Sequence, residues 1–175
     1  MPESVPYWNS LETTTEQKNG RRSRKWNEML DKLDEVKALI PHREPFLFVD
    51  EIVEYDGKRI LCKKTFTGDE FFFQGHYPGN PVVPGVIQCE AALQAGALML
   101  RKIFKDDEFG DRFPVVAKMG DTKFKQMVKP GDTIWMEAKF KDKMAGVYFF
   151  HVRVTVHDKT AVQFDVACAL TKIPE

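Results

Sequence analysis

The spacing of apolar residues changes along the chain and separates helical from strand-like regions. In residues 25–40, apolar side chains recur three or four positions apart, which predicts a helix. Pro41 marks the end of this helix, because proline disfavours helical geometry in the residue before it. Residues 85–104 form a second run that is apolar on nearly all sides, which is typical of a buried helix.

Strand-like segments make up most of the remaining chain. Residues 46–55 and 58–66 are rich in β-forming side chains and flank an Asp56-Gly57 turn signal, so they predict a hairpin. Four later segments follow one another with short turns between them, and in the last two apolar residues alternate with other residues. These segments span residues 114–124, 132–141, 146–157 and 160–172. The pattern predicts an antiparallel meander with one buried face.

Together these elements predict an α+β fold in which an antiparallel sheet of six strands curls round helix 85–104. Small residues in that helix, among them Ala91, Ala95 and Gly96, would let the sheet pack closely against it. A length of 175 residues suits a single domain. We assign residues 1–30 to a polar N-terminal extension that is poorly ordered or partly helical, and residues 31–175 to the folded domain.

Charge and hydropathy exclude several classes of protein. The 26 Lys and Arg residues balance the 26 Asp and Glu residues, which argues against nucleic acid as the main partner. The first 20 residues contain no apolar run that resembles a signal peptide. The most hydrophobic stretch, residues 85–100, is interrupted by Gln88, Glu90 and Gln94 and is too short for a membrane span. We therefore expect a cytoplasmic protein without a membrane span.

The cysteines favour a structural role over a chemical one. Cys62, Cys89 and Cys168 are widely spaced and form no C-x-x-C pair, so we interpret them as small core residues in a reducing compartment. A catalytic thiol is the alternative interpretation. His151 and His157 have no cysteine or acid at ligand spacing, so we predict no metal site.

The residues that point to chemistry lie around position 80. His76 sits in a loop that also contains Pro78, Pro81 and Pro84, and Glu90 lies near the start of the apolar helix. A buried carboxylate is costly unless it is paired or protonated, and a protonated carboxyl group can donate a proton. A histidine that acts as base and a carboxyl group that acts as acid together suit removal of a proton beside a carbonyl and loss of a hydroxyl one carbon further on. Taken singly, a loop histidine and a helical glutamate usually have structural or solvent-facing roles, so their combination carries the hypothesis.

The start of the apolar helix supplies a third component. Pro84 suits the first helical position, where its missing N–H costs nothing. The N–H groups of Gly85 and Val86 then lack intrahelical partners and, with the helix dipole, can bind a developing oxyanion. Gln94 lies four residues after Glu90 on the same face, where it can hold the orientation of the carboxyl group.

Several motifs occur along the chain in a recognisable order. They are IPHREPFLFVD at residues 40–50, FFQGHYPGNP at 72–81, PGV at 84–86 with Glu90-Ala91 after it, and KFKQMVKPGD at 123–132. Over roughly residues 33–172 the chain closely resembles the (3R)-hydroxyacyl-[acyl-carrier-protein] dehydratases of type II fatty acid synthesis. The resemblance implies a hotdog fold, in which the sheet wraps the long helix, and a homodimer that can assemble further into a trimer of dimers.

The resemblance also implies roles for particular residues. His76 falls on the catalytic histidine of the family and Glu90 on its catalytic acid, and in this family the two come from different subunits of the dimer. The backbone N–H that holds the thioester carbonyl falls on Gly85. Further candidate substrate-binding residues are Pro84, Val86, Gln94 and Tyr77. Tyr77 stands where the family usually has phenylalanine, and Met127 replaces a common proline.

The implied substrate is an acyl chain on the phosphopantetheine of an acyl carrier protein, and no other cofactor is expected. Candidate docking charges for this acidic partner are Lys123, Lys125, Lys129, Arg101 and Lys102, although ordinary surface cations are the simpler explanation. Glutamate at position 90 resembles the dehydratase-only branch of the family and leaves isomerase activity open.

Two alternative functions and the role of one further histidine, His42, remain to be considered. A hotdog protein that binds acyl thioesters without turning them over, as the partner of an active dehydratase, is one alternative, and a thioesterase is another. His42 matches a family motif, but the sequence gives it no evident acid partner, so we interpret it as structural.

Overall fold

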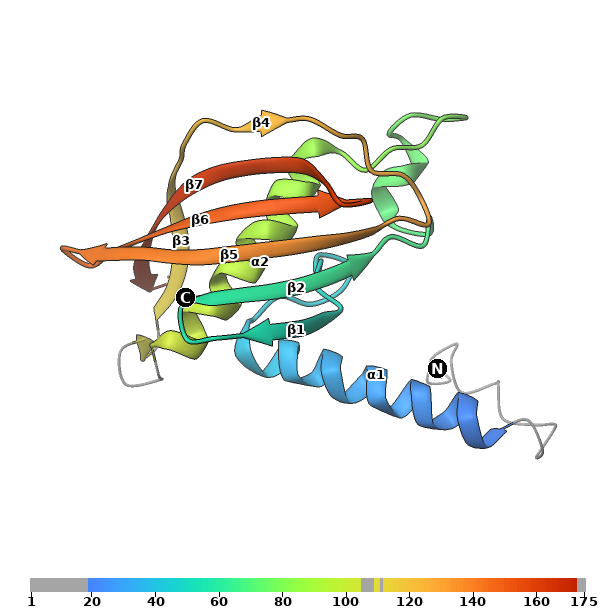
Figure 1. Ribbon diagram of the computed structural model, residues 1–175, viewed down its shortest axis with the longest axis horizontal. Helices are drawn as coiled ribbons and strands as arrows, with labels where there is room; N and C mark the ends of the chain where they lie inside the picture. The colour runs from blue at the N-terminus through green and yellow to red at the C-terminus, as the bar shows by residue number, and fades with distance from the viewer. Residues whose placement is uncertain (1–18, 105–108, 111, 173–175) are drawn as a thin grey trace, which may run out of the picture.

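The computed structural model describes residues 19–104, 109–110 and 112–172 (Figure 1). Its helices are α1 (Asn19–Leu39), the short 3-10 helix η2 (Phe71–Gln74) and α2 (Gly85–Ile103). Its strands are β1 (Glu51–Tyr55), β2 (Arg59–Thr65), β3 (Arg112–Met119), β4 (Lys123–Phe124), β5 (Thr133–Met144), β6 (Val147–Val156) and β7 (Lys159–Lys172).

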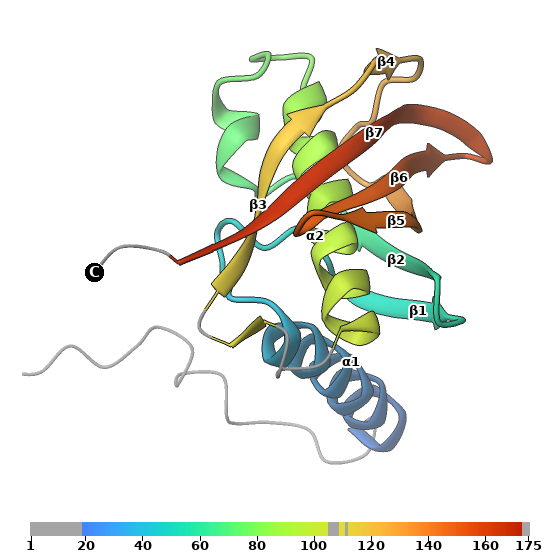
Figure 2. The same ribbon diagram turned by 90° about the vertical axis from the view of Figure 1, so that its left-hand side faces the viewer.

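The strands form one antiparallel sheet that curves around α2. The order across the sheet is β1-β2-β5-β6-β7-β3, and the short strand β4 pairs separately with β7. Figure 2 shows α2 lying along the concave side of this sheet, with α1 below it and the loop before α2 closing the opposite side. This arrangement confirms the predicted α+β hotdog fold.

Helix α2 is the centre of the core, as its composition predicted. Ala91, Ala92 and Ala95 are fully buried, and so are the larger residues Leu98, Met99 and Leu100. At Gly96 the sheet comes closest, because a Cβ atom built there would lie only 2.3 Å from Cε2 of Phe150 on β6. The small residues of α2 therefore let an aromatic ring of the sheet pack directly on the helix backbone.

Three predicted elements have a boundary that differs by more than three residues from the structure. Only residues 51–55 of the expected strand 46–55 join the sheet, because the backbone at Phe46 and Phe48 bonds to a glutamine of α2 instead. The expected strand 114–124 is divided into β3 and β4 by a turn, in which Gly120 donates to the carbonyl of Asp165 at 2.7 Å. Helix α1 begins at Asn19, six residues earlier than expected, and residues 1–18 of the predicted extension lie outside the described part of the chain.

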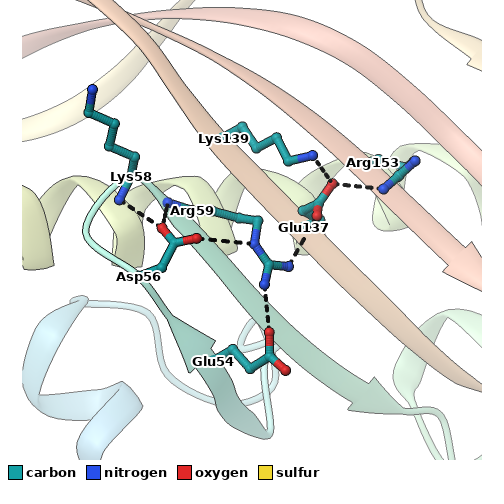
Figure 3. A network of polar contacts seen from close by, with 7 residues as sticks. All are labelled: Glu54, Asp56, Lys58, Arg59, Glu137, Lys139 and Arg153. Carbon is teal, nitrogen blue, oxygen red and sulfur yellow. Dashed lines mark hydrogen bonds and ion pairs between the residues drawn. The ribbon is translucent and has the colours of Figure 1, made fainter.

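The face of the sheet that points away from α2 carries a network of charged side chains (Figure 3). Glu137 on β5 lies at its centre and pairs with Arg59 at 3.2 Å, Lys139 at 3.1 Å and Arg153 at 2.9 Å. Arg59 also pairs with Glu54 at 2.6 Å. Burial opposes ionisation of Glu137, yet the surrounding cations hold its pKa below the ordinary value. This outer face is therefore a solvated, charged surface rather than a second core.

Candidate active site

The loop between η2 and α2 holds His76 through backbone groups on both sides. The N–H of His76 donates to the carbonyl of Phe72 at 3.0 Å, and its carbonyl accepts the N–H of Val82 at 3.2 Å. The ring nitrogen Nδ1 lies 3.0 Å from the carbonyl oxygen of Val82. Because a carbonyl oxygen can only accept, Nδ1 carries the hydrogen of the neutral ring, and Nε2 keeps its lone pair. The imidazole is thus oriented and in the tautomer that a general base requires.

Tyr77 covers one face of the His76 ring. The two ring centroids are 4.3 Å apart, and the rings are tilted by 34°. The peptide bond between the two residues is cis. With 60% of its surface exposed, Tyr77 leaves most of its own ring open to solvent.

The start of α2 lies directly beside this loop. The sequence suggested that Pro84 is the first helical residue. In the structure it is instead the N-cap, because its ψ of 139° is extended rather than helical. Its carbonyl accepts the N–H groups of Ile87 at 3.0 Å and Gln88 at 3.2 Å. The first two N–H groups of the helix therefore belong to Gly85 and Val86, as expected, and point away from the helical hydrogen-bond ladder. Two such donors at the positive end of a helix dipole could bind a developing oxyanion, as the sequence led us to expect.

The carboxyl group of Glu90 is held by the buried amide of Gln94. Gln94 Oε1 accepts the N–H of Phe48 at 2.8 Å, so its Nε2 must face the other way, where it donates to the carbonyl of Phe46 and to Glu90 Oε1, both at 2.9 Å. Because Oε1 of Glu90 accepts a hydrogen bond, a proton on this carboxyl group is favoured on Oε2. The Glu90 side chain keeps 24% of its surface exposed, so the expected deep burial is only partial. No described residue forms a hydrogen bond with Oε2 of Glu90, so this oxygen could contact a reacting group.

His42 is a neighbour of Glu90 that the sequence did not reveal. Its Nε2 lies 3.6 Å from Glu90 Oε1, so the histidine does have an acidic neighbour. Burial lowers the pKa of His42, Glu90 raises it and Arg43 lowers it, with a net decrease from the ordinary value. The environment of His42 thus favours its neutral form. The 48 positions between His42 and Glu90 hid this contact, since no periodic pattern connects a loop to a helix that far along the chain.

Within one chain the structure does not pair the two predicted catalytic residues. Among the described residues, His76 and Glu90 share no hydrogen bond or ion pair. His76 is fixed to Val82, whereas Glu90 is fixed to Gln94 and thereby to the segment around Phe48. Nε2 of His76 and Oε2 of Glu90 have no hydrogen-bond partner within residues 19–104, 109–110 and 112–172.

The five predicted docking cations fall into two separate groups. Arg101 and Lys102 lie in the last turn of α2, about 24 Å along the helix axis from Gly85 at 1.5 Å per residue. Lys102 pairs there with Glu35 at 2.8 Å, and Arg101 lies over the ring of Phe109. The other three are on β4 and the segment after it, which runs beside the start of α2 and comprises Lys123, Lys125 and Lys129.

The three cysteines are free, buried thiols, in agreement with the interpretation as core residues. Burial raises the pKa of Cys62 and Cys168 to about 12 and that of Cys89 to about 11. At neutral pH almost none of these thiols is ionised, which argues against a nucleophilic role.

The described residues contain neither a candidate metal site nor a candidate membrane-spanning helix. No three or more His, Cys, Asp or Glu side chains among them are grouped so that they could hold a metal ion. None of the helices formed by these residues combines the length and the apolar character that crossing a bilayer requires.

Comparison with solved structures supports the fold. A chain of the dehydratase heterocomplex ApeI:P from Xenorhabdus doucetiae superposes with a TM-score of 0.65 and 13% identity, covering 78% of this chain and 91% of that one. The PaaI protein of the phenylacetic acid degradation operon of E. coli gives a TM-score of 0.56 with 15% identity, over 85% and 97% of the two chains. At such low identity, these likenesses establish the hotdog architecture alone.

Sequence comparison is more specific. The protein described as 3-hydroxyacyl-[acyl-carrier-protein] dehydratase FabZ from Oenococcus oeni is 41% identical over 136 residues, which is 75% of this chain and 94% of that protein. Its counterpart from Chloroflexus aggregans is 38% identical over 140 residues, covering 79% and 95%. Residues 40–165 match the FabA-like domain, so this chain belongs to the FabA-like domain family.

Proposed function

We propose that this protein catalyses the dehydration of (3R)-3-hydroxyacyl-[acyl-carrier-protein] to trans-2-enoyl-[acyl-carrier-protein] in fatty acid or related acyl chain synthesis. The identity to dehydratases described as FabZ supports the substrate class. The observation that carries the proposal is the fixed orientation of the His76 and Glu90 side chains. His76 has a fixed tautomer with Nε2 free, and Glu90 has Oε1 occupied so that Oε2 remains for proton transfer.

The roles follow from these atoms. Nε2 of His76 removes a proton from C2 of the substrate while the N–H of Gly85 donates to the thioester oxygen, which gains negative charge. The electron pair left at C2 forms the C2–C3 double bond as the 3-hydroxyl departs. Oε2 of Glu90 protonates that hydroxyl, so it leaves as water. A proton then returns from His76 to Glu90 through solvent, and the site is ready for another turnover.

A second copy of the chain would complete the site. Strand β3 lies at the edge of the sheet and exposes Val115, Val116 and Met119, and Val86 at the start of α2 is 72% exposed. An open edge with apolar side chains invites pairing with another strand. A homodimer joined along β3 would cover these residues, and we propose that it brings Glu90 of one subunit to His76 of the other.

The carrier protein would approach from the side of β4. Lys123, Lys125 and Lys129 lie beside the start of α2, where the thioester must bind, whereas Arg101 and Lys102 are at the far end of that helix. We therefore keep the first three as candidate contacts for the acidic carrier. The phosphopantetheine arm would extend from this surface to the N–H of Gly85.

Single substitutions test the chemistry. We expect His76→Ala and Glu90→Ala each to lower the rate of enoyl-thioester hydration by about 100-fold or more, the usual scale for an acid or base. The reaction is followed as loss of enoyl absorbance with crotonyl and longer thioesters. Full activity in either variant would disprove the assignment. Release of free thiol would indicate a thioesterase, and binding without turnover would indicate a non-catalytic acyl-binding protein.

Mixing the two inactive variants tests the shared site. A heterodimer of His76→Ala and Glu90→Ala subunits keeps one intact pair, so equal mixing and exchange should restore about a quarter of the wild-type activity. If the catalytic pair lies within one chain, the mixture stays as inactive as its components.

A further inference from the structure

An aromatic ring packs directly against the proposed oxyanion donor. A Cβ atom built on Gly85 would lie 2.7 Å from Cε1, 3.0 Å from Cδ1 and 3.3 Å from Cζ of Phe124. Contacts this short mean that the ring occupies the space where any other residue at position 85 would carry its side chain. The position of the Phe124 ring therefore requires glycine at position 85.

Both sides of this contact are fixed by backbone hydrogen bonds. Phe124 belongs to β4 and pairs with Val162 of β7. The next residue, Lys125, donates its N–H to the carbonyl of Ala161 at 2.7 Å. On the helix side, the N–H of Val83, just before α2, donates to the carbonyl of residue 128 at 2.8 Å. The ring is consequently held over Gly85 by the segment between β4 and β5, which is hydrogen-bonded both to β7 and to the residue before Pro84.

The ring is also accessible. Although Phe124 touches Gly85, 55% of its surface is exposed in the single chain. An exposed aromatic surface beside an unpaired backbone N–H is suited to a group that is polar at one end and apolar at the other. A thioester is such a group, with a carbonyl oxygen next to sulfur and CH2.

We propose that Phe124 is a positioning residue for the thioester group of the substrate. Its ring closes the Cα side of Gly85, contacts the sulfur and carbon atoms next to the carbonyl, and leaves one direction from which the oxygen can reach the N–H. Restricting the bound orientation and excluding water on one side strengthen the hydrogen bond that stabilises the developing oxyanion. This inference rests on the proposed dehydratase function.

Substitution at Phe124 tests the contact with the thioester. We expect Phe124→Ala to lower kcat/KM by about tenfold to 100-fold, the scale of a misplaced reacting group, and by the same factor for four-carbon and eight-carbon acyl thioesters. Phe124→Leu, which keeps an apolar side chain there, should recover most of the loss. Met127→Ala is the matched control, since Met127 lies three residues further along the same segment and is 70% exposed. This control should keep wild-type activity.

A double-mutant cycle tests the contact with Gly85. Gly85→Ala should lower kcat by about 100-fold when Phe124 is present, because the new methyl group displaces the ring and the N–H together. In the Phe124→Ala background, the same change should cost at most a few fold, because the space is then free. The midpoint of thermal unfolding and the dimer mass of each variant are measured alongside, to confirm that the compared proteins are folded.

The possible outcomes are distinct. Independent, multiplicative effects of the two substitutions would overturn the proposal, and so would an unchanged rate for Phe124→Ala. A loss that grows with acyl length would also overturn it, because the ring would then line the acyl chain rather than the thioester. If His76→Ala is as active as wild type, the proposed function fails instead, whatever the Phe124 variants do.

Discussion

Gln94 offers the sharpest test of how the site is held together, because one buried side chain satisfies three groups. Its amide bonds the N–H of Phe48, the carbonyl of Phe46 and Oε1 of Glu90, and only 1% of Gln94 is exposed. Gln94→Leu keeps the approximate shape and removes all three bonds. Each backbone group left buried without a partner costs about 1–3 kcal/mol, and the half-buried Phe46 carbonyl lies at the lower end. We therefore expect a loss of roughly 2–4 kcal/mol in unfolding free energy.

The same change should be visible in two measurements. For a chain of this size, each kcal/mol lowers the midpoint of thermal unfolding by about 2–4 °C, so Gln94→Leu should unfold roughly 5–15 °C below wild type. Because Glu90 loses its fixed orientation, kcat should fall by about tenfold or more even at temperatures where the variant is fully folded. Denaturation followed by circular dichroism and the hydration assay provide the two readouts.

Gln88 is the matched control, since it has the same residue type on the same helix and is equally buried. Its Nε2 makes one long contact, 3.4 Å from the carbonyl of Val83, and its Oε1 has no partner among the described residues. Gln88→Leu should therefore change stability by less than about 1 kcal/mol. If both leucine variants lose the same stability, the cost reflects burial of any glutamine in α2, and the three-bond explanation for Gln94 is refuted.

Three further predictions concern the rest of the fold. The raised pKa values of the buried cysteines predict that a thiol reagent at pH 7 labels none of the three until the chain unfolds, which mass spectrometry would detect. The lowered pKa of Glu137 means that its ionised form stabilises the fold above the ordinary value of 4.5 and that this contribution disappears as the pH falls through the folded value. Thermal unfolding of Glu137→Gln should accordingly lie below wild type at pH 7 and approach it below pH 4.5, whereas a constant gap would contradict the ionic explanation. Gly96→Ala should cost about 1–3 kcal/mol in urea unfolding through its clash with Phe150, and no change would show that the ring can move away freely.

The parts of this fold that could be predicted from sequence are those with a regular period. The ends of helix α2 were predicted to within one residue. Its apolar character indicates that it is buried, and the proline before it indicates where it begins. Strands β6 and β7 followed from alternation with a period of two. The division of residues 114–124 into two strands left no such signal, because it depends on a hydrogen bond from Gly120 to a distant strand.

The contacts of the site illustrate the same limit. The spacing of four between Glu90 and Gln94 predicted that the amide could orient the carboxyl group, and the structure has that bond at 2.9 Å. The sequence did not indicate that the same amide binds Phe46 and Phe48, or that His42 lies beside Glu90. These contacts join segments more than 40 positions apart, and only the tertiary fold determines them.

The way each reactive group is anchored gives a physical reason to expect a site shared by two chains. His76 is bound through its ring to Val82, and Glu90 is bound through Gln94 to Phe48 on a different segment. With both anchors in place, His76 and Glu90 share no hydrogen bond or ion pair within the described part of the chain. A second subunit can present its own anchored Glu90 to this histidine, whose Nδ1 already carries the hydrogen and whose Nε2 keeps its lone pair. A site assembled in this way would have both groups oriented before the substrate arrives, and its activity would disappear on dilution to monomers while each chain remained folded.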